Sequence, residues 1–182
     1  AGIRSIPNMT VFRPADAKET AAAYTVAMNN DGPTTIVLTR QNLPYYENSG
    51  KNALKGGYIL EDSEKAIPDV ILIASGSEVE QAVEAKALLK NDNIDARVVS
   101  MPSMEIFEKQ SEEYKESVLP KNVRARVAVE AGASMCWYKY IGLDGATVCI
   151  DHFGASAPAK IIFEEFGFTA QNVAETAKRI IK

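Results

Sequence analysis

The spacing of apolar and polar residues predicts alternating strands and helices along most of the chain. Four short segments rich in Val, Ile and Ala predict strands, and segments with helical spacing separate them. The strands are expected at residues 69–74, 96–101, 125–130 and 146–151, and the helices at residues 105–118, 134–141, 158–166 and 169–182, with a further helix after Ser77. This order predicts a three-layer α/β/α domain with a mostly parallel, Rossmann-like sheet.

A strand–helix–strand unit is predicted before this domain. Residues 9–12 form a short strand, and Asp16 with Glu19 is a capping box for a helix that ends near Asn29. The apolar and β-branched run at residues 34–39 predicts a strand covered on both faces of a parallel sheet. Two strands and one helix cannot bury a core alone. We therefore expect a βαβ remnant of a second α/β domain, which continues in a larger sheet or docks on a partner.

Three of the helices carry an apolar stripe expected to lie on a sheet. The stripes consist of Ala21, Tyr24, Thr25 and Met28 in the first helix, of Val79, Ala82, Val83 and Leu89 in the helix that a Ser77–Glu80 capping box begins, and of Val173, Ala177, Ile180 and Ile181 in the last. These apolar helix faces should cover the two faces of the predicted sheets.

A polar, turn-forming stretch around residue 50 is typical of an interdomain linker. We therefore assign residues 1–50 to the end of one domain, residues 51–68 to a linker and residues 69–182 to a second domain. Within the linker, residues 56–60 offer one short strand, which we expect to be an antiparallel edge of the sheet.

The composition is that of an ordinary globular protein. The chain has 182 residues, 46% of them hydrophobic and 24% charged, with a net charge of -4. No Lys/Arg cluster large enough to cover a face interrupts the mixed charges, which argues against nucleic acid or an anionic membrane as the main partner. The longest apolar run, at residues 70–74, is far shorter than the roughly 18 residues that a membrane-spanning helix needs.

Neither metal binding nor redox pairing is favoured for the two cysteines. Cys136 and Cys149 stand in apolar surroundings at no metal or redox spacing, which predicts free thiols and a reducing, cytoplasmic compartment. The chain also begins Ala-Gly-Ile-Arg, without an initiator Met or a signal-type apolar stretch, so we expect a fragment of a longer protein.

Arg40 is the candidate binding residue. It follows the predicted strand at residues 34–39 and lies at its carboxyl end, the edge where ligands bind in open α/β sheets. A guanidinium there offers a fork of donors suited to phosphate or carboxylate. The alternative is a structural Arg that pairs with a nearby acid, and the spacing alone favours this alternative.

Two other features of the sequence could carry chemistry. The Ser75–Gly76–Ser77 turn leads from a strand into a helix, as phosphate-binding loops do, but it lacks the three-glycine fingerprint and the Walker lysine. Glu78 already places an anion there, which favours a plain turn. His152 is the only histidine, so no site with two imidazoles can form, and a structural, hydrogen-bonded role is favoured over a Ser-His-Asp triad.

Several motifs in the right order resemble the transketolase family over essentially the whole chain. Residues 6–16 (IPNMTVFRPAD) and 37–44 (VLTRQNLP) resemble its pyrimidine-binding domain, and residues 55–58, 69–79, 96–102, 107–110, 114–120 and 154–158 resemble its C-terminal domain. His152 departs from the family pattern, which often has Arg before Phe-Gly-Ala-Ser, and this does not touch the chemistry.

The resemblance implies a thiamine diphosphate enzyme of the pentose phosphate pathway that moves a two-carbon ketol unit from a ketose phosphate to an aldose phosphate. In the family, magnesium or calcium and the cofactor are held by residues that would precede Ala1. We therefore expect no catalytic, cofactor-binding or metal-binding residue in this chain, and no activity of the chain alone. Arg40 matches the family's Arg that grips the substrate phosphate, and the C-terminal domain extends the homodimer interface.

Other functions stay open at this point. The closest is another thiamine diphosphate enzyme, such as a deoxyxylulose-phosphate synthase or a pyruvate dehydrogenase β subunit, although the Thr-Arg-Gln-Asn-Leu-Pro stretch at residues 39–44 favours transketolase. A nucleotide-binding regulatory domain would need a ligand at the Gly76 turn. A pure dimerisation module would show Arg40 paired with a fixed internal acid.

Overall fold

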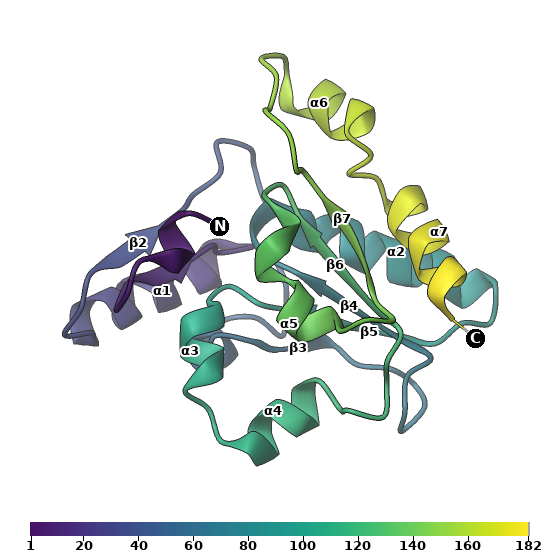
Figure 1. Cartoon of the computed structure of the whole chain (residues 1–182), viewed down its shortest axis with the longest axis horizontal. Helices are drawn as coiled ribbons and strands as arrows, with labels where there is room; N and C mark the ends of the chain where they lie inside the picture. Colours follow the sequence, from purple (N-terminus) through teal and green to yellow (C-terminus); the bar gives the residue numbers. More distant parts are fainter. Residues whose placement is uncertain (182) are drawn as a thin grey trace.

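A five-stranded sheet forms the centre of the larger part of the molecule (Figure 1). The computed structural model describes residues 1–181, and the strand order is β3-β5-β4-β6-β7. The strands are β3 (Tyr58–Glu61), β4 (Val70–Ala74), β5 (Ala96–Ser100), β6 (Arg126–Glu130) and β7 (Ala146–Cys149). Only β3 is antiparallel to its neighbour, β5, and the other pairs are parallel. The four predicted strands and the antiparallel edge strand are confirmed.

Helices cover both faces of this sheet, so the predicted three layers are confirmed. One face carries α2 (Val79–Asn91) and α7 (Ala170–Ile180), whose apolar residues share a core with Leu72, Val98 and Val127. The other face carries α3 (Met104–Glu108), α4 (Glu112–Val118) and α5 (Tyr138–Ile141), which pack on Ile71, Ile73 and Val99. Successive side chains of β4 point to opposite faces of the sheet and enter different cores. This is why the apolar run of β4 is unbroken.

Beyond β7 the chain forms α6 (Ala159–Glu165) and then α7, which runs beside α2 (Figure 1). The hydroxyl oxygen of Thr169 caps α7 by accepting a hydrogen bond from the Asn172 backbone N–H at 3.2 Å. The stripes predicted for α2 and α7 are buried or half-buried, as expected. Lys182, the predicted end of the last helix, lies outside the described residues. Among residues 1–181 no helix is long and apolar enough to cross a membrane.

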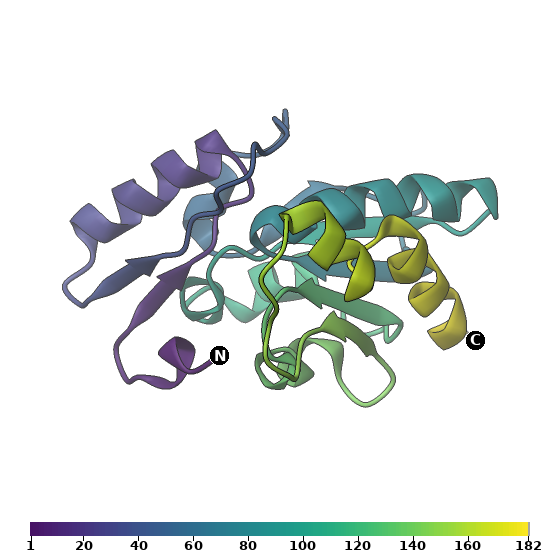
Figure 2. The ribbon, with the colours of Figure 1, turned by 90° about the horizontal axis from the view of Figure 1, so that it is seen from above.

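The N-terminal unit is a small parallel sheet with one helix. Strand β1 (Thr10–Phe12) pairs with β2 (Thr34–Ile36), and α1 (Ala17–Asn29) connects them. Figure 2 shows this unit beside the larger sheet rather than in line with it. The backbone N–H of Arg13 donates to the Pro102 carbonyl at 2.8 Å, and the N–H of Gly76 donates to the Arg13 carbonyl at 3.1 Å. The unit therefore packs at the carboxyl ends of β4 and β5.

Strand β2 is shorter and more exposed than predicted. It ends at Ile36, its residues are half-buried, and Val37 and Leu38 are 37% and 53% exposed. The prediction of a strand covered on both faces is wrong for the described chain. The exposure of β2 has a physical reason: within residues 1–181 this strand has only β1 as a strand neighbour and one helix to cover it.

The predicted stripe of α1 is also wrong. Tyr24 and Met28 are 55% and 86% exposed, whereas Glu19, Ala22 and Ala23 are buried. The small side chains of this other face let α1 approach the short 3-10 helix η2 (Lys51–Lys55) and share a core with β3. The helix therefore faces the larger domain with its small residues, and its large apolar side chains face outward.

Three predicted helix boundaries change for local reasons. The helix predicted at residues 105–118 is interrupted, because the Ser111 hydroxyl accepts from the Tyr114 backbone N–H at 3.2 Å and starts α4 anew. Ser77 does not cap α2: its hydroxyl donates to the Glu78 carboxylate at 2.6 Å within the 3-10 turn η3 (Gly76–Glu78). The helix predicted at residues 134–141 begins as a 3-10 turn, η4 (Ser134–Cys136).

Candidate functional site

Arg40 lies on the surface, in the loop that follows β2. The loop has no regular secondary structure, and Arg40 is exposed. Within residues 1–181 its guanidinium has no hydrogen bond or ion pair in the structure. The local acid that a structural role would require is therefore not in contact with it, and the guanidinium is available to an external anion.

Both ends of this loop are attached to the N-terminal unit. At the start, the Val37 backbone N–H donates to the Phe12 carbonyl at 2.8 Å. At the end, the Tyr46 backbone N–H donates to the Asp16 carboxylate at 3.3 Å, and Lys18 Nζ donates to the Tyr46 carbonyl at 3.0 Å. Arg40 thus lies in an exposed span between fixed points on β1 and α1.

The cleft next to the loop is not suited to a phosphate. It has a volume of about 360 Å³, with Gln41 and Asn42 on the loop side. The α2 side contributes Glu80 and Glu84, and burial together with the charge of Glu84 raises the pKa of Glu80. Three glutamates, Glu80, Glu84 and Glu164, line the cleft with one cation, Lys160, so its net negative charge repels a further anion. We therefore expect an anion to bind at Arg40 itself rather than in this cleft.

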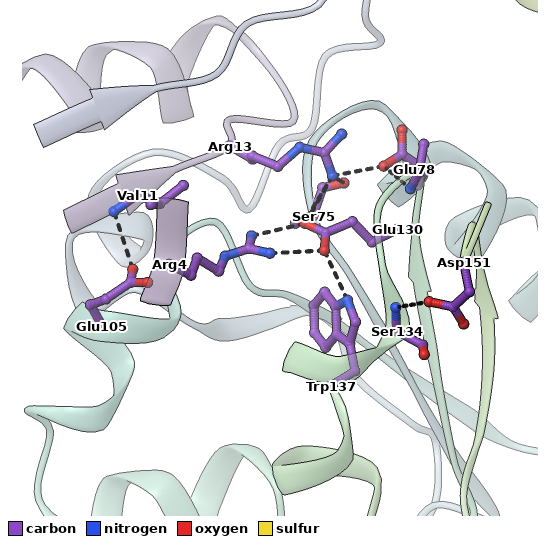
Figure 3. Close-up of polar contacts among 11 residues, drawn as sticks. Arg4, Val11, Arg13, Ser75, Glu78, Glu105, Glu130, Ser134, Trp137 and Asp151 are labelled. Atoms are coloured by element: carbon purple, nitrogen blue, oxygen red, sulfur yellow. Dashed lines mark hydrogen bonds and ion pairs between the residues drawn. The ribbon is translucent and has the colours of Figure 1, made fainter. Parts of the chain in front are cut away.

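Buried ion pairs join the N-terminal unit to the larger sheet (Figure 3). The guanidinium of Arg4 donates to both oxygens of Glu130, each at 2.8 Å. Arg13 Nη1 lies 2.8 Å from Glu78 Oε2 and 3.1 Å from Glu130 Oε1. We call Arg4, Arg13, Glu78 and Glu130 the ionic cluster. It joins the segment around β1 to the carboxyl end of β6, and the Trp137 indole N–H adds a donor to Glu130 at 3.0 Å.

Glu130 is held ionised by this cluster. Burial alone would raise the pKa of its carboxyl, but the hydrogen bond and charge of Arg4 and the charge of Arg13 outweigh burial and lower the pKa to about 2. The side chain of Glu130 is 3% exposed and that of Arg4 is 7% exposed. The cluster is therefore a structural connection and has little access to a ligand.

A second buried carboxylate at the same junction has no cation partner among residues 1–181. Glu19 of α1 accepts hydrogen bonds from the Tyr58 hydroxyl at 2.7 Å, from the Ser100 hydroxyl at 2.6 Å and from the Ala15 backbone N–H at 2.7 Å. Its side chain is fully buried. Burial raises the pKa of Glu19 to about 7, against the opposing effect of these donors and with a further increase from the charge of Asp16.

The Gly76 turn is occupied by protein groups. Gly76 has φ +61°, and its N–H is bonded to the Arg13 carbonyl. The Arg13 guanidinium would lie 3.1 Å from a Cβ added at this glycine, so the space above the turn is filled. Glu78 also accepts from the Ala131 backbone N–H at 2.9 Å. These contacts agree with the plain-turn interpretation.

His152 does not form a triad. It is exposed, its Nδ1 lies 2.8 Å from the Phe153 carbonyl, and its ring packs edge-on against Phe166 with centroids 5.0 Å apart. The neighbouring Asp151 carboxylate accepts from the Ser134 backbone N–H at 2.8 Å instead. The predicted structural, hydrogen-bonded role agrees with this geometry.

Metal binding has no obvious site in the described part of the chain. Among residues 1–181 no group of three or more His, Cys, Asp or Glu side chains could hold a metal ion. Both cysteines are free, as predicted, but half-buried rather than in the core, and burial raises the pKa of Cys149 to about 12. Such a thiol is largely uncharged and unreactive at neutral pH.

Sequence reasoning missed the residues of the ionic cluster and Glu19 as a group. A signal was present for some of them, because Arg13 directly follows β1 and Glu130 is a charged residue at the end of an apolar strand. Arg4 and Glu130 are 126 positions apart in the sequence, and no local pattern encodes a contact between residues so far apart.

The chain is similar in sequence to known protein families. Residues 56–169 match the family described as the transketolase-like C-terminal domain, and residues 1–45 match the transketolase pyrimidine-binding domain. The chain is 51% identical to the transketolase of Bacillus subtilis and 50% identical to transketolase 1 of Escherichia coli, in each case over 100% of this chain and 28% of the relative.

Solved structures agree with these matches. A transketolase from Pichia stipitis, solved in complex with sedoheptulose 7-phosphate, superimposes with a TM-score of 0.92 at 43% identity, over 99% of this chain and 26% of that chain. The chain therefore spans little more than a quarter of the length of these relatives. Since the C-terminal-domain match extends over residues 56–169 of the 182, the chain belongs to the transketolase family.

Proposed function

We propose that this chain contributes substrate-phosphate binding, through Arg40, to a thiamine diphosphate-dependent transketolase of the pentose phosphate pathway. The enzyme transfers a two-carbon ketol unit from a ketose phosphate to an aldose phosphate. The observation that carries the proposal is an exposed guanidinium without a partner among residues 1–181, in a loop attached at both ends. The Pichia stipitis relative, solved with a sugar phosphate, supports this substrate class.

The cofactor and its divalent metal, magnesium or calcium, would be held by other parts of the enzyme. Among residues 1–181 no group of three or more His, Cys, Asp or Glu side chains could hold the metal. We therefore assign no catalytic, cofactor-binding or metal-binding role to residues of this chain. Arg40 contributes by binding and orienting the substrate phosphate, and bond making takes place elsewhere.

We also propose the domain organisation and the surroundings of the chain. Residues 1–50 are the end of the pyrimidine-binding domain, residues 51–68 are a linker with an edge strand, and residues 69–182 are the C-terminal domain. The family matches at residues 1–45 and 56–169 support a boundary between the two domains near residue 50. The enzyme works as a homodimer in the cytoplasm, and the two free cysteines are consistent with a reducing compartment.

Replacing Arg40 tests the proposed function. In the full-length enzyme, Arg40→Gln should raise KM for phosphorylated sugars about ten- to a hundredfold, because a hydrogen bond to a charged group is worth roughly 1.5–3 kcal/mol. KM for unphosphorylated sugars should stay nearly unchanged. Steady-state kinetics with matched phosphorylated and unphosphorylated donors measures this difference.

The control is Arg179→Gln, which removes an exposed guanidinium from α7, remote from the loop in sequence. It should leave both KM values unchanged. Equal losses with phosphorylated and unphosphorylated sugars in Arg40→Gln would contradict the phosphate-binding role.

A further inference from the structure

We propose that Asp16 is a positioning residue for Arg40, and that its carboxylate sets the place of the phosphate-binding loop. The inference rests on the proposed function of Arg40. Asp16 is buried, with 1% of its surface exposed. Its effect would pass through the backbone of the loop.

The two oxygens of Asp16 have different partners. Oδ1 accepts from the Glu19 backbone N–H at 2.7 Å and caps the start of α1. Oδ2 accepts from the Tyr46 backbone N–H at 3.3 Å and from the Ser49 hydroxyl. One buried side chain therefore joins the first turn of a helix to the end of the loop that carries Arg40.

Lys18 strengthens the same attachment from the first turn of α1. Its Nζ donates to the Tyr46 carbonyl at 3.0 Å and to the Glu47 carbonyl at 2.9 Å, and lies 4.2 Å from the centre of the Tyr45 ring. With the Val37–Phe12 bond at the other end, only residues 38–44 lack an attachment to β1 or α1 among these contacts. Arg40 lies within this span.

Such an attachment matters for phosphate binding because the guanidinium fork must meet the phosphate oxygens in a defined orientation. Displacements of about 1 Å can cost up to about a hundredfold in a reaction that depends on alignment. A loop released at one end samples more positions, so a smaller fraction of molecules presents Arg40 correctly. The loss should appear as weaker binding of phosphorylated substrates.

Asp16→Asn separates the two roles of the side chain. Asn is as good a helix N-cap as Asp, so its oxygen can still accept from the Glu19 N–H. Its amide nitrogen is a donor and cannot accept from the Tyr46 N–H, and it accepts nothing from the Ser49 hydroxyl. Ser49→Ala is a milder second variant, which removes the hydroxyl's hydrogen bonds to Asp16 and to the Tyr46 carbonyl and leaves the cap of α1 intact.

The experiment compares Asp16→Asn, Ser49→Ala, Arg40→Gln and the double variant of Asp16 and Arg40 in the full-length enzyme. For Asp16→Asn we expect KM for phosphorylated sugars to rise about three- to tenfold. Ser49→Ala should show a smaller rise in the same direction. In both variants kcat and KM for unphosphorylated sugars should stay unchanged. Asp31→Asn, an exposed change in the same unit, is the matched control and should have no effect.

The double variant separates the two proposals. If Asp16 acts through Arg40, Asp16→Asn should raise KM no further when Arg40 is already Gln. A normal KM in Asp16→Asn and Ser49→Ala, with a raised KM in Arg40→Gln, overturns the positioning role alone. A loss of kcat with every sugar in Ser49→Ala also overturns it, since that pattern indicates a general structural defect. An unchanged KM in Arg40→Gln overturns the proposed function instead.

Discussion

Glu130→Gln should lower the free energy of unfolding by about 3–5 kcal/mol, which is the largest effect that we expect from a single substitution in this chain. The carboxylate is buried and faces two guanidinium groups, those of Arg4 and Arg13. Removing its charge leaves Arg4 without an ion-pair partner and Arg13 with Glu78 alone, in a poorly solvated site. Urea unfolding measures the loss, and Trp137, the only tryptophan, reports it by fluorescence because its indole N–H contacts Glu130.

Glu113→Gln is the matched control, since this residue is an exposed glutamate of α4. It should change the free energy of unfolding by less than about 0.5 kcal/mol. The pH dependence gives a second test. Because the folded-state pKa of Glu130 is about 2 and its ordinary value is 4.5, its contribution is present above pH 4.5 and is lost as the pH falls toward 2. A loss in Glu130→Gln below about 1 kcal/mol would contradict the role of the ionic cluster.

Glu19→Gln should change how stability depends on pH in the opposite direction. The pKa of Glu19 is about 7 in the folded state against an ordinary value of 4.5, because the carboxyl is buried without a cation. The folded protein therefore keeps a proton that the unfolded chain releases. The stability from this group is fully present below pH 4.5 and is lost as the pH rises through about 7.

At about 1.4 kcal/mol per pH unit, this interval corresponds to a loss of about 3 kcal/mol between pH 4.5 and pH 8. Urea unfolding of the wild type and of Glu19→Gln across this range isolates the contribution. We expect the wild type to lose stability relative to the variant as the pH rises. A constant difference between the two proteins would mean that Glu19 is ionised in the folded state throughout.

The fold of the larger domain could be predicted because its signals are local. Each parallel strand is a short apolar run, and β4 is buried on both faces, so its residues needed no alternation. The cap of α1 by Asp16 could also be predicted, since Asp16 and Glu19 have the spacing of a capping box. In these cases the residues that form the element also specify it.

The orientation of α1 could not be predicted from its own residues. Tyr24 and Met28 gave the larger apolar stripe, yet the buried face consists of Glu19, Ala22 and Ala23. The larger domain selects that face, because small side chains allow close approach and because Tyr58 and Ser100 provide donors for Glu19. A polar residue in a buried face is visible only when its distant partners are known.

The candidate site was predicted in part for a similar reason. Arg40 stands at the end of an apolar strand, which identified it as a possible anion-binding residue, but the acid that a structural role needs could lie anywhere in the chain. Only the folded structure shows that no such acid contacts it among residues 1–181. The attachment of its loop to Asp16 is also a long-range contact, and the sequence identified Asp16 only as a helix cap.

The most direct test of the phosphate-binding role is a crystal structure of the full-length enzyme with a ketose phosphate bound. We expect the Arg40 guanidinium to donate hydrogen bonds to the phosphate oxygens, at the distances of about 2.7–2.9 Å that charged pairs adopt. The loop should keep its contacts to Asp16. A phosphate bound by other residues, with Arg40 directed into solvent, would contradict the account.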